Sequence, residues 1–342
     1  MNTADCSTIK SIIFSKDITD VHLTQDEKPW VRKNNGDLVL LKESEPISSE
    51  QIEEFYCWLK KNGIGRNNNW ACSFPEESIR IRIKTAVSLA KKQLFIRKIP
   101  LISPKIDSLG VKNIINPLLS PSPGIFWLSG PTGSGKSTLL ASLVRHYLEN
   151  HPLHIVTIED PVEYLFGPAI GSISQRQVGM DIESFEQGVN DSLREDPDVI
   201  MIGEARDCET LHAALVAAET GHLVLATVHA TDVSGIIERT LGMFPGQNKE
   251  YMAIRISQTF LGGMALRLIK SKRDPESRVL AHEIVWGNKS VKSHIRDNRI
   301  HQLPGAIEAS MGQGMHTLKQ HLDKLISSSL ISEEEANKWL FL

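Results

Sequence analysis

The segment GPTGSGKST, residues 130–138, constrains the fold more than any other part of the chain. It matches the pattern G-x-x-x-x-G-K-[S/T] and directly follows the apolar run at residues 125–128, so the sequence predicts a strand, a glycine-rich loop and then a helix. The glycines of such a P-loop let backbone N–H groups close around phosphate oxygens, and the helix directs its positive end at the same anion. The alternative is a glycine-rich turn that binds nothing, which the flanking strand and helix disfavour.

The residues expected to surround the phosphates all belong to this loop and the start of its helix: Gly130, Pro131, Thr132, Gly133, Ser134, Gly135, Lys136, Ser137 and Thr138. Lys136 supplies a point charge for the β- and γ-phosphates of a nucleotide, and the hydroxyl of Ser137 is placed to ligate Mg²⁺. The sequence therefore predicts ATP and Mg²⁺ as ligands.

The region after residue 124 alternates short apolar runs with helical segments. The runs lie at residues 125–128, 155–158, 199–202 and 223–228. Alternation of this kind indicates a largely parallel sheet that is covered on both faces. We therefore expect an α/β domain over residues 124–288, followed by a polar helical region over residues 289–342.

Acidic residues follow two of these runs, at the sheet edge where ligands bind in open α/β folds. Glu204 comes directly after the run at residues 199–202 and is a candidate ligand of Mg²⁺. Glu159, Asp160 and Glu163 follow the run at residues 155–158, and Glu163 suits a general base that orients the attacking water. The alternative is that these are solvated loop residues, which the recurrence at two strand ends disfavours.

Two histidines bracket the run GHLVLATVHA. In a parallel sheet His229 lies at the carboxyl end, near Lys136, Glu163 and Glu204, and is the candidate that contacts a phosphate oxygen or the lytic water. His222 lies at the amino end, roughly 20 Å away in an extended strand, so both histidines cannot contact one phosphate. For His222 a structural and a functional role both remain open.

The first part of the chain has a different character. Residues 1–99 combine strand-like runs with one helical segment at residues 48–61, for which Ser49 is the candidate cap, and Asn35-Gly36 predicts a hairpin turn. In the run SIRIRIKT, alternation puts isoleucines on one face and Arg80 and Arg82 on the other. We expect a smaller α+β domain here, joined by a proline- and serine-rich linker at residues 100–123.

Composition limits the possible partners. The 342 residues carry a formal charge of -3, which argues against a nucleic-acid binder. No run reaches the roughly 18 apolar residues of a membrane span, and the opening MNTADCSTIK has no signal-peptide pattern. The four cysteines form no C-x-x-C pair. We expect a cytoplasmic protein without direct membrane insertion; a nucleic-acid translocase and a nucleotide-bound regulator without turnover are the disfavoured alternatives.

Several segments in order resemble one superfamily. TIEDPVEY, SLREDPDVIMIGEARD and TGHLVLATVHATD resemble the Asp box, the Walker B segment and the His box of the type II/type IV secretion ATPases. The segments SFPEESIRIRIKT, FIRKIP, QRQVGMD and GMHTLKQHLDKLISSSLIS are similar to those of the type IV pilus retraction ATPases, the twitching motility proteins. The likeness covers nearly the whole chain.

This resemblance implies a homohexamer whose subunits each carry a PAS-like amino-terminal domain and a RecA-like P-loop ATPase domain. It implies a catalytic role for Glu163, an Mg²⁺-holding role for Glu204 and membership of the His box for His229, together with His222. Arg80, Arg82 and Arg97 match the arginines that approach nucleotide phosphates, some of them across the subunit boundary. The implied function is a motor for pilus retraction that docks on an inner-membrane platform protein and is thereby peripheral to the inner membrane.

Two departures from the family pattern keep an alternative open. Where the retraction subgroup has a motif close to AIRNLIRE, this chain has SVKSHIRD, with Ser293-His294 in place of asparagine and leucine. The tetra-cysteine loop of the assembly ATPases is absent from the sequence, which argues against an extension motor. A related ATPase that energises a type IV secretion or conjugative pilus system is the alternative.

Overall fold

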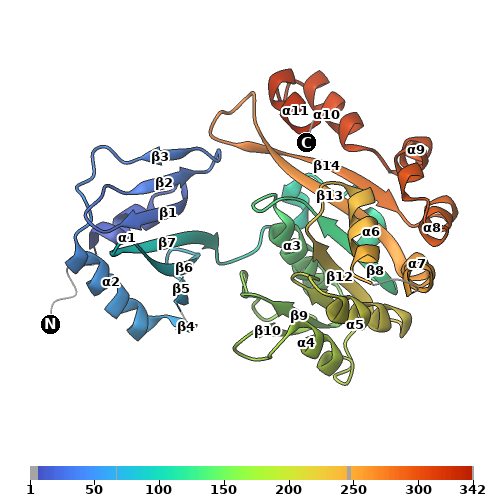
Figure 1. Ribbon diagram of the computed structural model, residues 1–342, viewed down its shortest axis with the longest axis horizontal. Coiled ribbons are helices and arrows are strands. Elements are labelled where there is room, and N and C mark those ends of the chain that lie inside the picture. Colours follow the sequence, from blue (N-terminus) through green and yellow to red (C-terminus); the bar gives the residue numbers. More distant parts are fainter. Residues whose placement is uncertain (1–6, 67, 245–247, 341–342) are drawn as a thin grey trace. The chain divides into compact units, whose positions relative to one another are not determined.

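The computed structural model describes residues 7–66, 68–244 and 248–340 (Figure 1). The chain divides into two compact units. The first unit comprises the chain up to Ile102 together with residues 163–165 and 274–278, and the second unit comprises the remainder. The domain boundaries expected from the sequence, at residues 99, 123 and 288, stay a prediction.

The first unit is built on a seven-stranded sheet in the order β3-β2-β1-β7-β6-β5-β4, and every neighbouring pair is antiparallel. Its strands are β1 (Ile18–Thr24), β2 (Trp30–Lys33), β3 (Leu38–Leu40), β4 (Ile64–Arg66), β5 (Asn69–Phe74), β6 (Ile79–Ser88) and β7 (Lys91–Pro100). The predicted turn at Asn35-Gly36 lies between β2 and β3, where Gly36 has a φ of 94° that favours glycine.

One face of this sheet carries the core of the first unit. Ile81 and Ile83 of β6 are buried there against α1 (Ser7–Phe14) and α2 (Ser49–Asn62), as the period-2 pattern predicts. The cap of α2 is Ser48, not Ser49: its hydroxyl accepts from Gln51 N–H, and the Gln51 side chain accepts from Ser48 N–H. This reciprocal pair needs three residues of spacing to a Gln or Glu, and only Ser48 has it.

The second unit is built on a seven-stranded sheet in the order β10-β9-β11-β12-β8-β13-β14. The strands from β10 to β13 in this order are parallel to their neighbours. They are β8 (Gly124–Ser129), β9 (His154–Glu159), β10 (Ser172–Gln177), β11 (Val199–Ile202), β12 (Leu223–Val228), β13 (Phe260–Lys270) and β14 (Arg278–Trp286). The expected α/β fold with a mostly parallel sheet is confirmed.

Both faces of this sheet are covered, which explains why its strands are apolar at successive positions. One face packs against α3 (Lys136–Asn150) and against residues around η1 (Ile106–Leu109) and η2 (Asn116–Leu118). The other face packs against helices that include α4 (Phe185–Ser192), α5 (Cys208–Glu219), α6 (Val233–Gly242), α7 (Asn248–Thr259), α8 (Lys289–Arg296) and α9 (Leu303–Ala309). Within β8, Ile125 and Phe126 therefore contribute to different cores.

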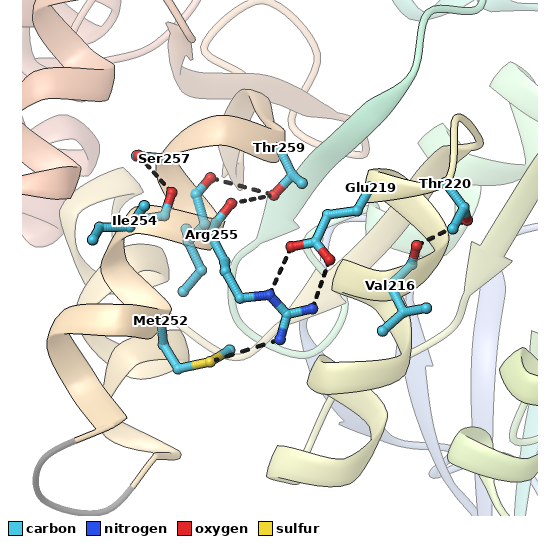
Figure 2. Close-up of polar contacts among 9 residues, drawn as sticks. Val216, Glu219, Thr220, Met252, Ile254, Arg255, Ser257 and Thr259 are labelled. Atoms are coloured by element: carbon cyan, nitrogen blue, oxygen red, sulfur yellow. Dashed lines mark hydrogen bonds and ion pairs between the residues drawn. The ribbon is translucent and has the colours of Figure 1, made fainter.

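An ion pair links α5 and α7. Both oxygens of Glu219 accept from the Arg255 guanidinium, at 2.6 Å from Nε and 2.7 Å from Nη2 (Figure 2). The Arg255 side chain is only 10% exposed, and its Nη1 also approaches the sulfur of Met252. The fork of two parallel bonds fixes how these two helices lie together.

The chain ends in short helices (red in Figure 1). After η3 (Ile300–Gln302) and η4 (Met311–Gln313) come α10 (Leu318–Ser327) and α11 (Glu333–Leu340). Leu322, Leu325 and Ala336 of these last two helices form a small core with Ile269 and Ala281 of the sheet. Across the described residues, no helix has the length and apolarity needed to traverse a bilayer.

Candidate active site

Four parallel strands of the second unit end side by side. In the sheet order, β9, β11, β12 and β8 are consecutive neighbours. Their carboxyl ends lead to Asp160, Glu204, His229 and Gly130 respectively. The topology therefore brings Asp160, Glu204, His229 and the P-loop to one edge of the sheet.

The P-loop has the backbone that its glycines predict. Gly130, Gly133 and Gly135 have φ values of 138°, 76° and 96°, which residues with a side chain rarely adopt. A Cβ on Gly130 would meet Leu266 O at 2.5 Å and Ser134 Oγ at 2.6 Å, so that position also lacks space. At Gly133 and Gly135 no atom lies within 4 Å of an added Cβ. The backbone there faces open space that a ligand could fill.

The loop offers groups that suit a phosphate. The Lys136 ammonium donates to the carbonyls of Gly130 at 2.7 Å and Pro131 at 3.0 Å, which holds its charge within the loop. Helix α3 begins at Lys136 with no side-chain cap on its first N–H groups. The buried Ser134 Oγ finds no hydrogen-bond partner among the described residues. Positive charge, uncapped N–H groups and an unsatisfied hydroxyl fit a bound phosphate and its Mg²⁺.

Glu204 is held between the side chains of Arg206 and His229. One carboxylate oxygen accepts from Arg206 at 2.7 Å, and the other lies 3.1 Å from His229 Nε2. Burial acts to raise the pKa of Glu204, but the Arg206 hydrogen bond and the charges of His229, Arg206 and Lys136 together hold that pKa below its ordinary value. The carboxylate is thus ionised, as a Mg²⁺ ligand must be.

The acidic residues at the end of β9 and just after it belong to different units. Glu159 is buried and accepts from the Thr157 hydroxyl at 2.8 Å. Asp160 helps raise the pKa of Arg206, although the hydrogen bond to Glu204 is the larger cause. Glu163 belongs to the first unit, together with Leu165, whose N–H donates to Leu101 O at 3.3 Å. The structure thus brings Glu204 and His229 together, while Glu163 belongs with the other unit.

The predicted arginines share one face of the first unit's sheet. Arg97 lies directly opposite Arg82 on one side and Asp20 on the other, and Asp20 lies opposite Arg32. Arg97 Nε donates to Asp20 at 2.7 Å. Arg80 is two residues from Arg82 and so belongs to the same face. We call Arg32, Arg80, Arg82 and Arg97 the basic row. Asp20 lies opposite two of these arginines, Arg32 and Arg97. Like charges directly opposite each other, such as Arg82 and Arg97, are unfavourable without an anion beside them.

The comparisons with known proteins cover most of the chain. Residues 64–326 match the family model described as "Type II/IV secretion system protein". The chain belongs to this family.

Relatives within the family are named for pilus motors. The chain is 37% identical over 242 residues to a "Twitching motility protein" of Neisseria gonorrhoeae, a match that covers 71% of this chain and 64% of that protein. It is 36% identical to the "Type IV pilus retractation ATPase PilT" of Pseudomonas aeruginosa, over 71% of this chain and 70% of the relative. The resemblance to this ATPase family predicted from the motifs is confirmed, and so is the assignment as an ATPase.

A solved structure supports the fold. The "Crystal Structure of the Pilus Retraction Motor PilT and Bound ADP" superposes with a TM-score of 0.82 at 32% identity, and the match covers 98% of this chain and 96% of that one. The ATPase DotB of Legionella pneumophila superposes with a TM-score of 0.81 at 23% identity and shows the same fold. These matches confirm the expected fold, a RecA-like domain preceded by a smaller α+β domain.

The two histidines that flank β12 have different surroundings. His229 is 44% exposed at the edge beside Glu204. His222 Nδ1 lies 2.8 Å from Ala217 O and 3.1 Å from the Thr220 hydroxyl, at the end of α5. This geometry favours the structural role for His222.

Sequence reasoning missed two residues of the site. Arg206, two residues after Glu204, forms an ion pair with it, and the GEARD segment that contains both was a usable signal. Asp20, which pairs with Arg97, gave no such signal because 77 residues separate the two.

Proposed function

We propose that the chain is an ATP-hydrolysing motor that drives retraction of a type IV pilus. The observation that carries the proposal is the edge where the P-loop, Glu204 and His229 meet, in a fold that matches an ADP-bound pilus retraction motor over 98% of the chain. The named relatives support pilus retraction over the secretion alternative.

In the proposed site the P-loop backbone and Lys136 hold the β- and γ-phosphates of ATP. Ser137 and Glu204 would hold Mg²⁺, which neutralises charge on the phosphates when bound. Glu163 accepts a proton from the attacking water and orients it, and His229 contacts the γ-phosphate or that water. Arg206 keeps the carboxylate of Glu204 ionised and in place.

The motor is proposed to work as a homohexamer, docked on an inner-membrane platform protein at the cytoplasmic side. Arg80, Arg82 and Arg97 approach the phosphates from the first unit, some of them across the subunit boundary. Guanidinium groups that arrive on a mobile unit neutralise developing charge, so hydrolysis is coupled to rotation of that unit against the neighbouring subunit.

Deletion of the gene tests this function directly. We expect persistent, overabundant surface pili, because filaments would assemble without being retracted. The wild-type gene should restore dynamics, whereas Glu163→Gln should not, and the purified variant should hydrolyse ATP at least about 100-fold more slowly. Glu308→Gln, an exposed change on α9, is the matched control and should behave as wild type.

Other outcomes of the deletion would contradict retraction. Absent pili would indicate an assembly motor, and normal pili with lost secretion would indicate the secretion-channel alternative. No ATP turnover by the purified wild-type protein, alone or with the platform protein, would contradict a motor of any kind.

A further inference from the structure

Three histidines that take no part in the proposed ATPase site converge near the end of the chain. His282 lies on β14, His316 directly precedes the cap of α10, and His321 lies in the first turns of α10. The ring centroid of His282 lies 4.8 Å from that of His316 and 3.9 Å from that of His321. All three belong to the second unit.

The backbone fixes this convergence. Ile284 N–H donates to His316 O at 3.0 Å, and His316 N–H donates to Ile284 O at 3.2 Å. These two hydrogen bonds tie His316, the residue before the cap of α10, to β14. His282 is two residues from Ile284, so it lies on the same face of the strand.

The cap of α10 brings the other two histidines together. Thr317 is the cap, and Thr317 and Gln320 form a reciprocal capping box. His316 and His321 therefore occupy the positions just before the cap and four residues after it, which in many helices hold a pair of contacting apolar residues. Here both are histidines, with ring centroids 5.1 Å apart.

The ring nitrogens lie at separations close to those of a metal site. Three nitrogens, one from each histidine, lie within 4.8 Å of one another. His316 Nε2 and His282 Nδ1 are 2.9 Å apart. Zn–N bonds of about 2.0–2.1 Å in a tetrahedral site correspond to nitrogens about 3.3 Å apart, so shifts of a few tenths of an ångström up to about 1.5 Å would form the site.

A backbone carbonyl is placed to orient one of the rings. His282 N–H donates to His321 Nδ1 at 3.0 Å, and His282 O lies 3.2 Å from the same nitrogen, so the tautomer of His321 decides which of the two bonds forms. When Nδ1–H donates to this carbonyl, Nε2 keeps its lone pair. Metal-binding histidines commonly have this second hydrogen bond to a carbonyl or carboxylate, which fixes the ring and its tautomer.

The surroundings favour the neutral imidazoles that bind metal. Burial lowers the pKa of His282 and His316, and it lowers the pKa of His321 to about 4, with smaller contributions from neighbouring charges. The charge of Lys324, on the same helix as His321, also contributes to lowering the pKa of all three histidines. The positive charge of Lys324 repels a bound cation, so a substitution that removes this charge should strengthen cation binding.

We propose that His282, His316 and His321 form a binding site for Zn²⁺ that fastens α10 to β14. Three imidazoles suit zinc and other late first-row cations, whereas Mg²⁺ and Ca²⁺ prefer oxygen ligands. A water molecule would complete the tetrahedron. The site is independent of the ATPase edge, and the bound ion would stabilise the small core that α10 and α11 share with the sheet.

Zinc titration of the chelator-treated full-length protein tests the site. We expect one equivalent of Zn²⁺ to bind per chain in competition with a chromophoric chelator, and bound Co²⁺ to give the visible absorption of tetrahedral coordination. His316→Gln and His321→Gln should each weaken binding at least about 10-fold and remove the rise in melting temperature that Zn²⁺ causes. Lys324→Gln should tighten binding by about 2- to 5-fold, because a nearby surface charge is removed.

His301→Gln, an exposed histidine outside the cluster, is the matched control and should bind zinc as wild type does. Circular dichroism of each variant without zinc establishes that it folds, and the partly exposed His316 and His321 are chosen over the buried His282 for this reason. Wild-type binding no tighter than that of the folded His316→Gln/His321→Gln double variant would overturn the proposal. The three histidines would then form only a hydrogen-bonded cluster.

Discussion

At the scale of single residues, Glu204 shows how the edge of the sheet keeps a carboxylate ready for a cation. Its side chain is only 15% exposed, and its two oxygens already contact the Arg206 guanidinium and the His229 imidazole. Burial by itself favours the protonated form, so the ionised state depends on its neighbours. Arg206 is the neighbour that contributes most to lowering the pKa.

Arg206→Gln tests this dependence. Because Arg206 lowers the pKa of Glu204 while burial raises it, the variant should raise this pKa. A carboxylate with a higher pKa loses its charge at higher pH, so the acid limb of the ATPase pH profile should move to higher pH. The rate should fall more at pH 5.5 than at pH 8, at saturating Mg²⁺. Arg299→Gln, which removes a pair with Asp297 on the surface, should leave the profile unchanged; an unshifted limb in Arg206→Gln would refute this role.

At the scale of helices and strands, the packing of α7 depends on one charged pair. Arg255 is nearly buried, whereas its partner Glu219 on α5 is 34% exposed. The guanidinium is always ionised, so loss of Glu219 would leave a largely buried charge without its carboxylate. That asymmetry predicts that substitution of Glu219 is more damaging than substitution of Arg255.

Glu219→Ala should lower the free energy of unfolding by about 1–3 kcal/mol, since charged hydrogen bonds to a desolvated partner are lost. Glu219→Ala combined with Arg255→Met should recover much of this loss, because the unpaired charge is gone. Urea unfolding gives the difference. Glu149→Ala, which removes an i,i+4 pair with Arg145 on α3, is the control and should cost about 0.3–0.5 kcal/mol. A double variant less stable than Glu219→Ala alone would contradict this account.

Patterns among neighbouring residues in the sequence predict most of the fold. The alternation in β6 and the glycines of the P-loop were readable because each depends on neighbouring residues. The helix α2 was also predictable, but its cap was placed one residue late because Gln51 was not used to choose between two serines. The pairing of Arg97 with Asp20 depends on strand register between distant segments, which one sequence does not specify.

The histidine cluster shows the same limit. His316 and His321 are close in sequence, and the capping box between them predicts their contact. His282 joins them only through the bridge between Ile284 and His316. In the sequence alone, GMHTLKQHL is a family signature, and its two histidines do not by themselves indicate a metal site.

At the scale of the whole molecule, the residues that we propose to act on ATP come from both units. The P-loop, Glu204 and His229 belong to the second unit, and the basic row with Arg82 and Arg97 belongs to the first. The hexamer proposed above allows each first unit to serve the P-loop of a neighbouring subunit. In that arrangement an arginine variant and a P-loop variant damage different halves of the same active site.

Mixing two inactive proteins distinguishes service across the subunit boundary from service within a subunit. Lys136→Ala lacks the phosphate-binding charge but keeps its arginines, and Arg82→Ala keeps its P-loop. After dissociation and reassembly of a 1:1 mixture, about one quarter of the interfaces should join an intact P-loop to an intact Arg82, so ATP turnover should reappear. Lys136→Ala mixed with Lys136→Ala/Arg82→Ala contains no intact P-loop and should stay inactive. If the first mixture also stays inactive although mass spectrometry shows mixed rings, Arg82 does not act on the neighbouring subunit's nucleotide. In that case the proposed coupling of hydrolysis to rotation lacks the contact on which it depends.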